Sequence, residues 1–262
     1  MHNNLLEQYL YVYRKKQNLT VLAFFDITIK YRRTALGPLW QVITLLLSVI
    51  LLSIVWSTLF KMDIKDYVPR LFFGMTTYSI LVAAITGGCT LISATYSAQI
   101  RTSNIPLQFY IVRHLISTIM NYLHYVPVFL ILIIFADIKV NLNTLLLIPA
   151  FILVFLNFLW IATVMSIIGS RFRDIIPLTE TLMSVGSLLT PILWDKKMLG
   201  PNEIFVYINP LTFFVEAVKY PWVGQNPGLI PYLGLIVMLI IGNFIQFWMI
   251  KNKGHRVPFW AS

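Results

Sequence analysis

Residue types that perform chemistry are few in this sequence, and none of them forms a recognisable catalytic motif. The phosphate-binding GxxxxGK[ST] loop, the HExxH zinc motif and the GxSxG nucleophile motif are all absent. Cys89 is the single cysteine, which excludes a disulfide within the chain, and His2, His114, His124 and His255 are scattered singly. We therefore predict no catalytic residue, no metal site and no cofactor bound by this chain. The histidines are expected to be hydrogen-bonded scaffold.

Glu180 is the sharpest candidate for a functional side chain, because it is an ionisable carboxylate inside a long apolar stretch. A charged group in hydrocarbon costs about 2.5 to 3.5 kcal/mol unless it meets a partner or water. We expect Glu180 to face the interior of a helix bundle, where it would serve a pathway or pair two helices. The alternative is a group near a helix end that Thr179, Thr181 or lipid headgroups satisfy.

The elements that must position such side chains are six long stretches almost free of charge. Crossing about 30 Å of hydrocarbon takes about 20 apolar helical residues. Composition agrees, since 58% of the residues are hydrophobic and 11% are charged, with a mean hydropathy of +0.77. We predict an all-α integral membrane protein with six transmembrane helices and no soluble catalytic domain. The predicted spans are Thr34 to Phe60, Leu71 to Ile100, Leu115 to Ala136, Val140 to Ser170, Ile175 to Trp194 and Tyr220 to Ile250.

Basic residues are distributed unequally between the two sides that these spans define. Lys and Arg are retained on the cytoplasmic side of a membrane, whereas acidic residues contribute little to orientation. The two termini and the second and fourth loops carry thirteen basic residues, and the remaining loops carry seven. We therefore predict that both termini are cytoplasmic, and that the basic face attracts anionic membrane lipids without a need to bind nucleic acid. The thirteen are Arg14, Lys15, Lys16, Lys30, Arg32, Arg33, Arg101, Arg113, Arg171, Arg173, Lys251, Lys253 and Arg256.

The first 36 residues form a segment that is too polar to cross a membrane. Its apolar residues recur at helical spacing beside a basic flank, which predicts an amphipathic helix lying in the cytoplasmic interface. Gly37–Pro38 marks the turn into the first span. Residues 37–262 are therefore expected to form the membrane domain. The apolar residues of the amphipathic helix are Leu5, Leu6, Tyr9, Leu10 and Tyr13.

The segment 195–228 is long for an external loop and contains many apolar residues that require burial. We predict a pair of short re-entrant helices between the fifth and sixth spans, split near Asn209–Pro210 and dipping into the outer leaflet. Non-helical backbone at membrane depth is tolerated only against protein or a water-filled cavity. The hairpin is therefore expected beside a pathway through the membrane.

Several local motifs resemble those of type 2 ABC permeases that export polysaccharides, the group that handles O antigen, capsule and teichoic acid. Tyr31–Trp40, with the sequence YRRTALGPLW, closely resembles the entry motif of that family. Arg171–Ile175 with Thr190–Trp194 is similar to the two ends of its fifth span, and Ile208–Leu211 with Pro221–Gly224 is similar to its external gate region. The resemblance runs in order from about Leu22 to Pro258, and the stretch 100–106 resembles the O-antigen branch most.

The resemblance implies a homodimer of six-span subunits joined to two ATPase subunits, which bind the ATP and Mg²⁺ that this chain does not. It implies a bacterial inner-membrane exporter that moves a lipid-linked polysaccharide, O antigen before capsule or teichoic acid, to the outer side. The element that touches the ATPase would correspond to Arg101, Thr102, Ser103, Asn104, Ile105, Pro106 and Leu107. The external gate would correspond to Asn209, Pro210, Phe213 and Phe214.

Arg32, Arg33, Leu36 and Gly37 form the position at which we expect the substrate to load. The pyrophosphate of a lipid-linked glycan would lie at the cytoplasmic interface, where two guanidinium groups supply charge-assisted hydrogen bonds. Ordinary anchoring to anionic lipids is the alternative role for these arginines. Two other classes of protein stay open: a type 2 ABC permease for drugs or small lipids, and a membrane-embedded acyltransferase that modifies glycans.

Overall fold

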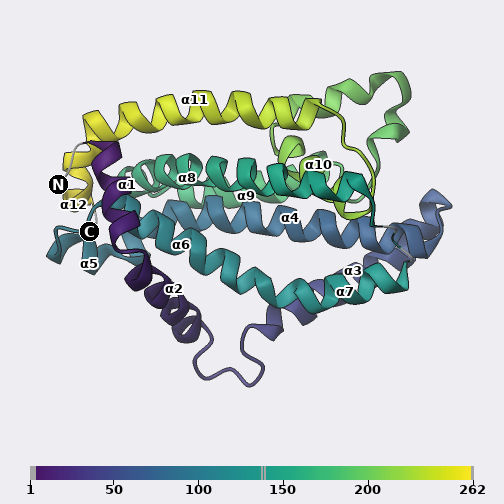
Figure 1. The fold of residues 1–262 in the computed structure, drawn as a ribbon, viewed down its shortest axis with the longest axis horizontal. Helices are drawn as coiled ribbons and strands as arrows, with labels where there is room; N and C mark the ends of the chain where they lie inside the picture. Colours follow the sequence, from purple (N-terminus) through teal and green to yellow (C-terminus); the bar gives the residue numbers. More distant parts are fainter. Residues whose placement is uncertain (1–3, 137, 139, 261–262) are drawn as a thin grey trace.

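The long helices of this protein run side by side, and the shorter ones gather at the two ends of the bundle (Figure 1). The computed structural model describes residues 4–136, 138 and 140–260, and His2, Asp137 and Lys139 lie outside them. The first and last described helices, α1 (Leu5–Arg14) and α12 (Val257–Trp260), gather with α5 (Ser97–Thr102) at one end, the terminal end. The opposite end, the hairpin end, holds α10 (Leu211–Trp222).

Five helical segments are long and apolar enough to cross a membrane, which makes this a multi-pass membrane protein. They match the first, second, third, fourth and sixth predicted spans with shifted ends. The five are α3 (Leu39–Phe60); α4 (Ile64–Thr90) with the π-helix η1 (Leu91–Thr95); α6 (Leu107–Tyr122), η2 (Leu123–Tyr125) and α7 (Val126–Phe135); η3 (Leu142–Leu146) and α8 (Leu147–Arg171); and α11 (Ile230–Lys253) with η5 (Gly254–Arg256) and α12.

The shifted ends have local causes in the sequence. α4 begins at Ile64, well before the predicted start of its span, because the Asp63 carboxylate caps it by accepting a 2.8 Å hydrogen bond from the Lys65 amide. The sixth span begins at Ile230, ten residues later than predicted. Gly224 and Gly228, with φ of 73° and 80°, turn the chain between α10 and α11, and this conformation suits glycine.

The predicted fifth span, Ile175 to Trp194, differs most from its prediction. Only Ile175–Leu189 is helical; this helix, α9, has 15 residues and covers about 22 Å, less than a typical membrane span. Thr190 is extended (φ −84°, ψ 139°) because it precedes Pro191, which disfavours the helical conformation. The chain then continues without a helix to the hairpin end, where the Tyr67 hydroxyl donates a 2.6 Å hydrogen bond to the Leu193 carbonyl.

Helix α4 is the centre of the core and packs closely against α8 and α6. A Cβ atom added to Gly88 would lie 3.1 Å from the Ala162 Cα of α8, and one added to Gly169 of α8 would lie 2.3 Å from the Cys89 carbonyl oxygen. Where hydrophobicity cannot drive association, such close backbone approach holds membrane helices together. The small residues of α4 and α8 therefore fix the frame that carries the other elements.

The amino-terminal segment forms the predicted helix α1 and a second helix, α2 (Lys16–Lys30). Leu19 of α2 is buried with Phe109 and Val112 of α6, and the ring of Tyr11 meets the ring of Phe109 edge to face at 6.0 Å. The opposite faces of α1 and α2 keep large apolar side chains exposed. Both helices are thus fixed to the terminal end of the bundle while an apolar face stays free.

Candidate functional site

The loop between α2 and α3 carries the four predicted loading residues at the edge of the bundle. Arg33 and Gly37 both have left-handed backbone, with φ of 72° and 56°, and nothing lies within 4 Å of a Cβ added to Gly37. Arg32, Arg33 and Leu36 are exposed. Neither guanidinium forms an ion pair with any residue that the structure describes. The loop therefore presents two unneutralised cations beside the start of α3.

A polar cavity of about 720 Å³ lies beside this loop, between α2, α3, α4 and α6. The loading residues do not line it; Lys30, the last residue of α2, does. Its walls also carry hydroxyl and amide side chains together with His114. The side chains of Thr95 and Gln99 are exposed at its terminal end, so the cavity is open there.

An ion pair fixes α2 to the membrane helices at the wall of this cavity. The Asp26 carboxylate accepts hydrogen bonds from Arg113 Nε at 2.7 Å and Nη2 at 2.5 Å, and from the Tyr96 hydroxyl at 2.7 Å. Arg113 also lies over the Tyr96 ring, 4.7 Å from its centroid. Because the Arg113 side chain is 8% exposed, this carboxylate is its essential counter-charge. Residues 87 positions apart in the sequence are thereby joined.

The predicted coupling stretch is a helix end and a linker, not a separate helix. Arg101 and Thr102 close α5, residues 103–106 have no helical structure, and Leu107 begins α6. Arg101, Thr102 and Asn104 are exposed, whereas Pro106 and Leu107 are buried. The Ser103 hydroxyl lies 2.8 Å from the Tyr110 hydroxyl, which ties the linker back onto α6. The stretch is partly exposed at the terminal end and joins α5 to α6.

The segment predicted to form the hairpin contains the 3₁₀ segment η4 (Lys196–Ile208), which ends at Asn209–Pro210, where α10 begins. The Asn209 amide donates a 2.9 Å hydrogen bond to the Thr190 hydroxyl at the end of α9. Phe213 stacks on Tyr207 with ring centroids 5.6 Å apart, so it joins the two arms. Phe214 is 1% exposed and stacks on Phe158 of α8. Phe214, one of the four predicted gate residues, therefore packs in the core of the subunit and lines no open surface of the single chain.

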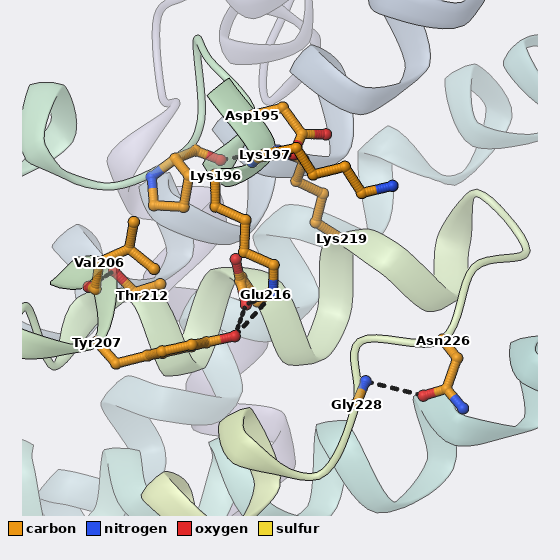
Figure 2. Close-up of polar contacts among 11 residues, drawn as sticks. Asp195, Lys196, Lys197, Val206, Tyr207, Thr212, Glu216, Lys219, Asn226 and Gly228 are labelled. Carbon is orange, nitrogen blue, oxygen red and sulfur yellow. Dashed lines mark hydrogen bonds and ion pairs between the residues drawn. The ribbon is translucent and has the colours of Figure 1, made fainter. Parts of the chain in front are cut away.

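Charged side chains concentrate where the hairpin meets the bundle (Figure 2). One carboxylate oxygen of Glu216 accepts hydrogen bonds from Lys196 at 2.9 Å and from the Tyr207 hydroxyl at 2.7 Å. Its other oxygen is buried and has no partner among the described residues. Burial raises the pKa of Tyr207 to about 12, so this phenol stays a hydrogen-bond donor. The hairpin is closed on itself by this three-residue contact.

Lys219, one turn beyond Glu216, ties the hairpin to the end of α9. Lys219 is 2% exposed, and its ammonium group donates a 2.7 Å hydrogen bond to the Pro191 carbonyl. Burial lowers the pKa of Lys219 to about 8. A second ion pair, Arg70 to Asp195 at 3.2 Å, joins α4 to the start of the hairpin. The hairpin is thus held to α4 and to the segment that follows α9 by charged groups that water reaches poorly.

Glu180 does not occupy the position predicted for it. It is exposed on α9 of the single chain, whereas Thr179 and Met183 form the buried face of that helix. The expectation that it faces the interior of the bundle is therefore wrong for one subunit. His114 packs against Gly87, and its Nε2 is buried with no partner in the part of the chain that the structure describes, while His124 contacts the Asn121 carbonyl at 2.9 Å. No group of three or more metal-ligating residues occurs in the described part of the chain.

Sequence reasoning missed both charged clusters, although a signal for one was present. Glu216 and Lys219 interrupt the otherwise apolar run Leu211 to Tyr220, and charges in such a run require buried partners. Asp26 and Arg113 also stand singly among apolar residues, but nothing in the sequence indicates that these two residues pair with each other. Their pairing depends on how α2 lies against α6.

The comparison with known proteins gives one family. A family model described as ABC-2 type transporter matches residues 17–222, which include the loop between α2 and α3, the polar cavity and both η4 and α10. No curated protein matches the chain.

Proposed function

The chain belongs to the ABC-2 type transporter family, and from this premise we propose that it exports a lipid-linked polysaccharide, with O antigen as the expected cargo. A permease of this family is a transmembrane subunit without a catalytic domain, and it typically pairs with an ATP-binding subunit. The acyltransferase alternative is therefore wrong. The proposed assembly is a homodimer with two ATPase subunits in a bacterial inner membrane.

The choice of cargo rests on the loop between α2 and α3, which we call the entrance loop. Arg32 and Arg33 present two cations without an ionic partner among the described residues, at the edge of the bundle where a lipid headgroup would arrive. A pyrophosphate carries more charge than the phosphodiester of an ordinary lipid and can accept hydrogen bonds from both guanidinium groups. Leu36 is exposed beside them and supports loading of a long apolar carrier.

In this proposal the chain crosses the membrane six times, because of the order in which its helices are connected. Five spans alone would leave the two chain ends on opposite sides of the membrane. Both ends lie at the terminal end of the bundle, and α9 with its extended tail joins the terminal end to the hairpin end (Figure 1). We assign this segment as the remaining crossing, the fifth along the chain, and place the terminal end in the cytoplasm, where basic residues are retained.

In the proposed mechanism, the stretch Arg101–Asn104 moves first, because it lies at the cytoplasmic end and joins α5 to α6. ATP binding on the partner presses this stretch, and the Asp26–Arg113 ion pair passes the displacement to α2 and the entrance loop. The hairpin at Asn209–Pro210 closes the outer end of a canal between the two subunits. Opening it requires the contacts with Thr190 and Pro191 to separate.

The test compares a double charge reversal, Arg32→Glu with Arg33→Glu, with Lys251→Glu and Lys253→Glu at the same end of the bundle. The entrance variant should lose export and accumulate lipid-linked polymer inside cells at unchanged membrane levels, whereas the control should export normally. Intact export by the entrance variant would remove the loading assignment. If cells that lack the protein still export polymer but accumulate a drug or a small lipid, the chain would instead be a permease for drugs or small lipids.

A further inference from the structure

Two cavities of opposite character meet inside one subunit. The polar cavity of about 720 Å³ and an apolar cavity of about 350 Å³ share Tyr122 as a common wall. Along α4, the apolar lining begins at Phe73 and ends at Ile80, and the polar lining then runs from Ala83 to Thr90 and continues to Thr95 of η1. One trough between α4 and α6 therefore changes from polar at the terminal end to apolar toward the hairpin end.

The polar part contains unused hydrogen-bonding groups at buried positions. His114 Nε2 and Asn121 Oδ1 both belong to lining residues, and neither atom has a partner among the described residues. Buried polar atoms are normally satisfied, so an occupant with hydrogen-bonding groups of its own is expected here. Asp26 and Arg113 neutralise each other, which leaves Lys30 as the uncompensated charge of the lining. The net charge of the site is thus about +1.

The apolar part opens sideways, toward the space that hydrocarbon occupies. Ile119, Leu123, Val126 and Phe151 line it and are also exposed on the surface of the bundle. The opening follows from the break between α6 and α7, where η2 (Leu123–Tyr125) and Pro127 interrupt the α-helical geometry. An apolar chain can therefore enter from the bilayer without passing through the protein.

We propose that this trough is a site for one bilayer glycerophospholipid per subunit, with its headgroup between α2 and α6 and an acyl chain against Phe73 and Trp222. A phosphodiester carries one negative charge, which matches the single free cation Lys30. A headgroup with hydroxyl or ammonium donors also satisfies the free oxygen of Asn121. The site lies within one subunit, apart from the canal between subunits, so the bound lipid is a resident component and not the cargo.

A pyrophosphate-linked carrier fits the same trough less well. Its two or more negative charges exceed the one cation available, and an unpaired charge in a poorly hydrated cavity is costly. The two unneutralised guanidinium groups lie on the loop outside the cavity. The number of cations at each site therefore assigns the pyrophosphate-linked carrier to the loop and the phospholipid to the trough.

The first test blocks the apolar part in the full chain purified with its ATPase. Val126→Trp fills the cavity from an exposed edge, and Ile131→Trp adds the same ring to the exposed surface of α7 outside the lining. After removal of free lipid and addition of phosphatidylglycerol, native mass spectrometry should find one lipid per chain in the wild type and in Ile131→Trp. Val126→Trp should retain at least about fivefold less. Equal retention in both variants, or no lipid in the wild type, would overturn the proposal.

The second test examines the headgroup. Lys30→Gln should weaken phosphatidylglycerol binding about fivefold, the effect of one basic residue on an anionic lipid, whereas Lys251→Gln should not change it. Zwitterionic phosphatidylcholine should respond less to Lys30→Gln. An isoprenyl diphosphate that displaces phosphatidylglycerol at equal concentration would assign the trough to the cargo and refute this inference. Because lipid retention is measured without transport, loss of the proposed export function would leave this result unchanged.

Discussion

Replacement of Lys196 by Met tests whether the outer hairpin is held by its buried ion pair. Glu216 is fully buried, and one of its carboxylate oxygens accepts hydrogen bonds from both Lys196 and Tyr207. Removal of one partner of a buried pair costs about 3 to 5 kcal/mol, since the remaining charge is left uncompensated. The Lys196 side chain is 16% exposed, so we take the lower limit, about 3 kcal/mol. This corresponds to about a 150-fold larger population of the opened hairpin.

Hydrogen exchange measures this opening directly. The full chain with its ATPase in lipid nanodiscs should exchange the amides of residues 196–222 about 150-fold faster in Lys196→Met, with α8 unaffected. Lys197→Met is the matched control, because Lys197 is exposed and its side chain points away from Glu216 (Figure 2). Lys196→Met combined with Glu216→Gln should recover most of the protection, since no buried charge is then left alone.

Two results would refute this reasoning. Equal exchange in the Lys196 and Lys197 variants would show that apolar packing of α10 alone holds the hairpin. A double variant that opens as far as Lys196→Met would show that Lys196 acts through contacts other than the Glu216 carboxylate.

Three further predictions concern other parts of the molecule. Asp26→Asn should free α2 and make it sensitive to limited proteolysis, at a cost of about 2 to 4 kcal/mol, because Arg113 loses its counter-charge; Asp26→Asn with Arg113→Gln should lose less than the single variant. Gly169→Ala should lower the melting temperature strongly, since its Cβ meets the backbone of α4 at 2.3 Å, whereas Gly254→Ala, with its nearest atom at 3.7 Å, should not. Burial lowers the pKa of Lys219 to about 8 in the folded protein from the ordinary value of 10.5, so the unfolded chain binds the proton more tightly. Stability should rise by about 3 kcal/mol between pH 8 and pH 10.5, and Lys219→Met should abolish that rise in denaturation measured against pH.

Much of the architecture could be predicted from the sequence because it depends on local properties. The length of each apolar run decides whether a helix can cross the bilayer, and five of the six predicted spans satisfy that condition in the structure. Proline and glycine effects are equally local. The segment η4 ends and α10 begins at Asn209–Pro210, and Gly37 takes the left-handed backbone that turns the chain into α3.

The ends of the membrane spans were predicted less well, because the mean hydropathy of a stretch takes no account of charged groups that form ion pairs in the folded protein. Arg113 was expected to lie outside a span, yet it lies in the second turn of α6 because Asp26 neutralises it. The short helix α9 ends where Pro191 makes Thr190 extended, a local signal that its apolar length concealed. Glu180 was placed inside by its neighbours in sequence, although the face of α9 that packs on the bundle carries other residues.

The sequence by itself determined a helical membrane protein, the order of its apolar helices and the points at which the chain turns. Tertiary structure alone decided which charged groups pair, where the polar and apolar cavities meet, and that Phe214 packs in the core. The physical reason is distance along the chain: Asp26 and Arg113 are 87 residues apart and Arg70 and Asp195 are 125 apart. Hydropathy and turn chemistry act over a few residues, whereas the pairing of buried charges depends on which helices are neighbours.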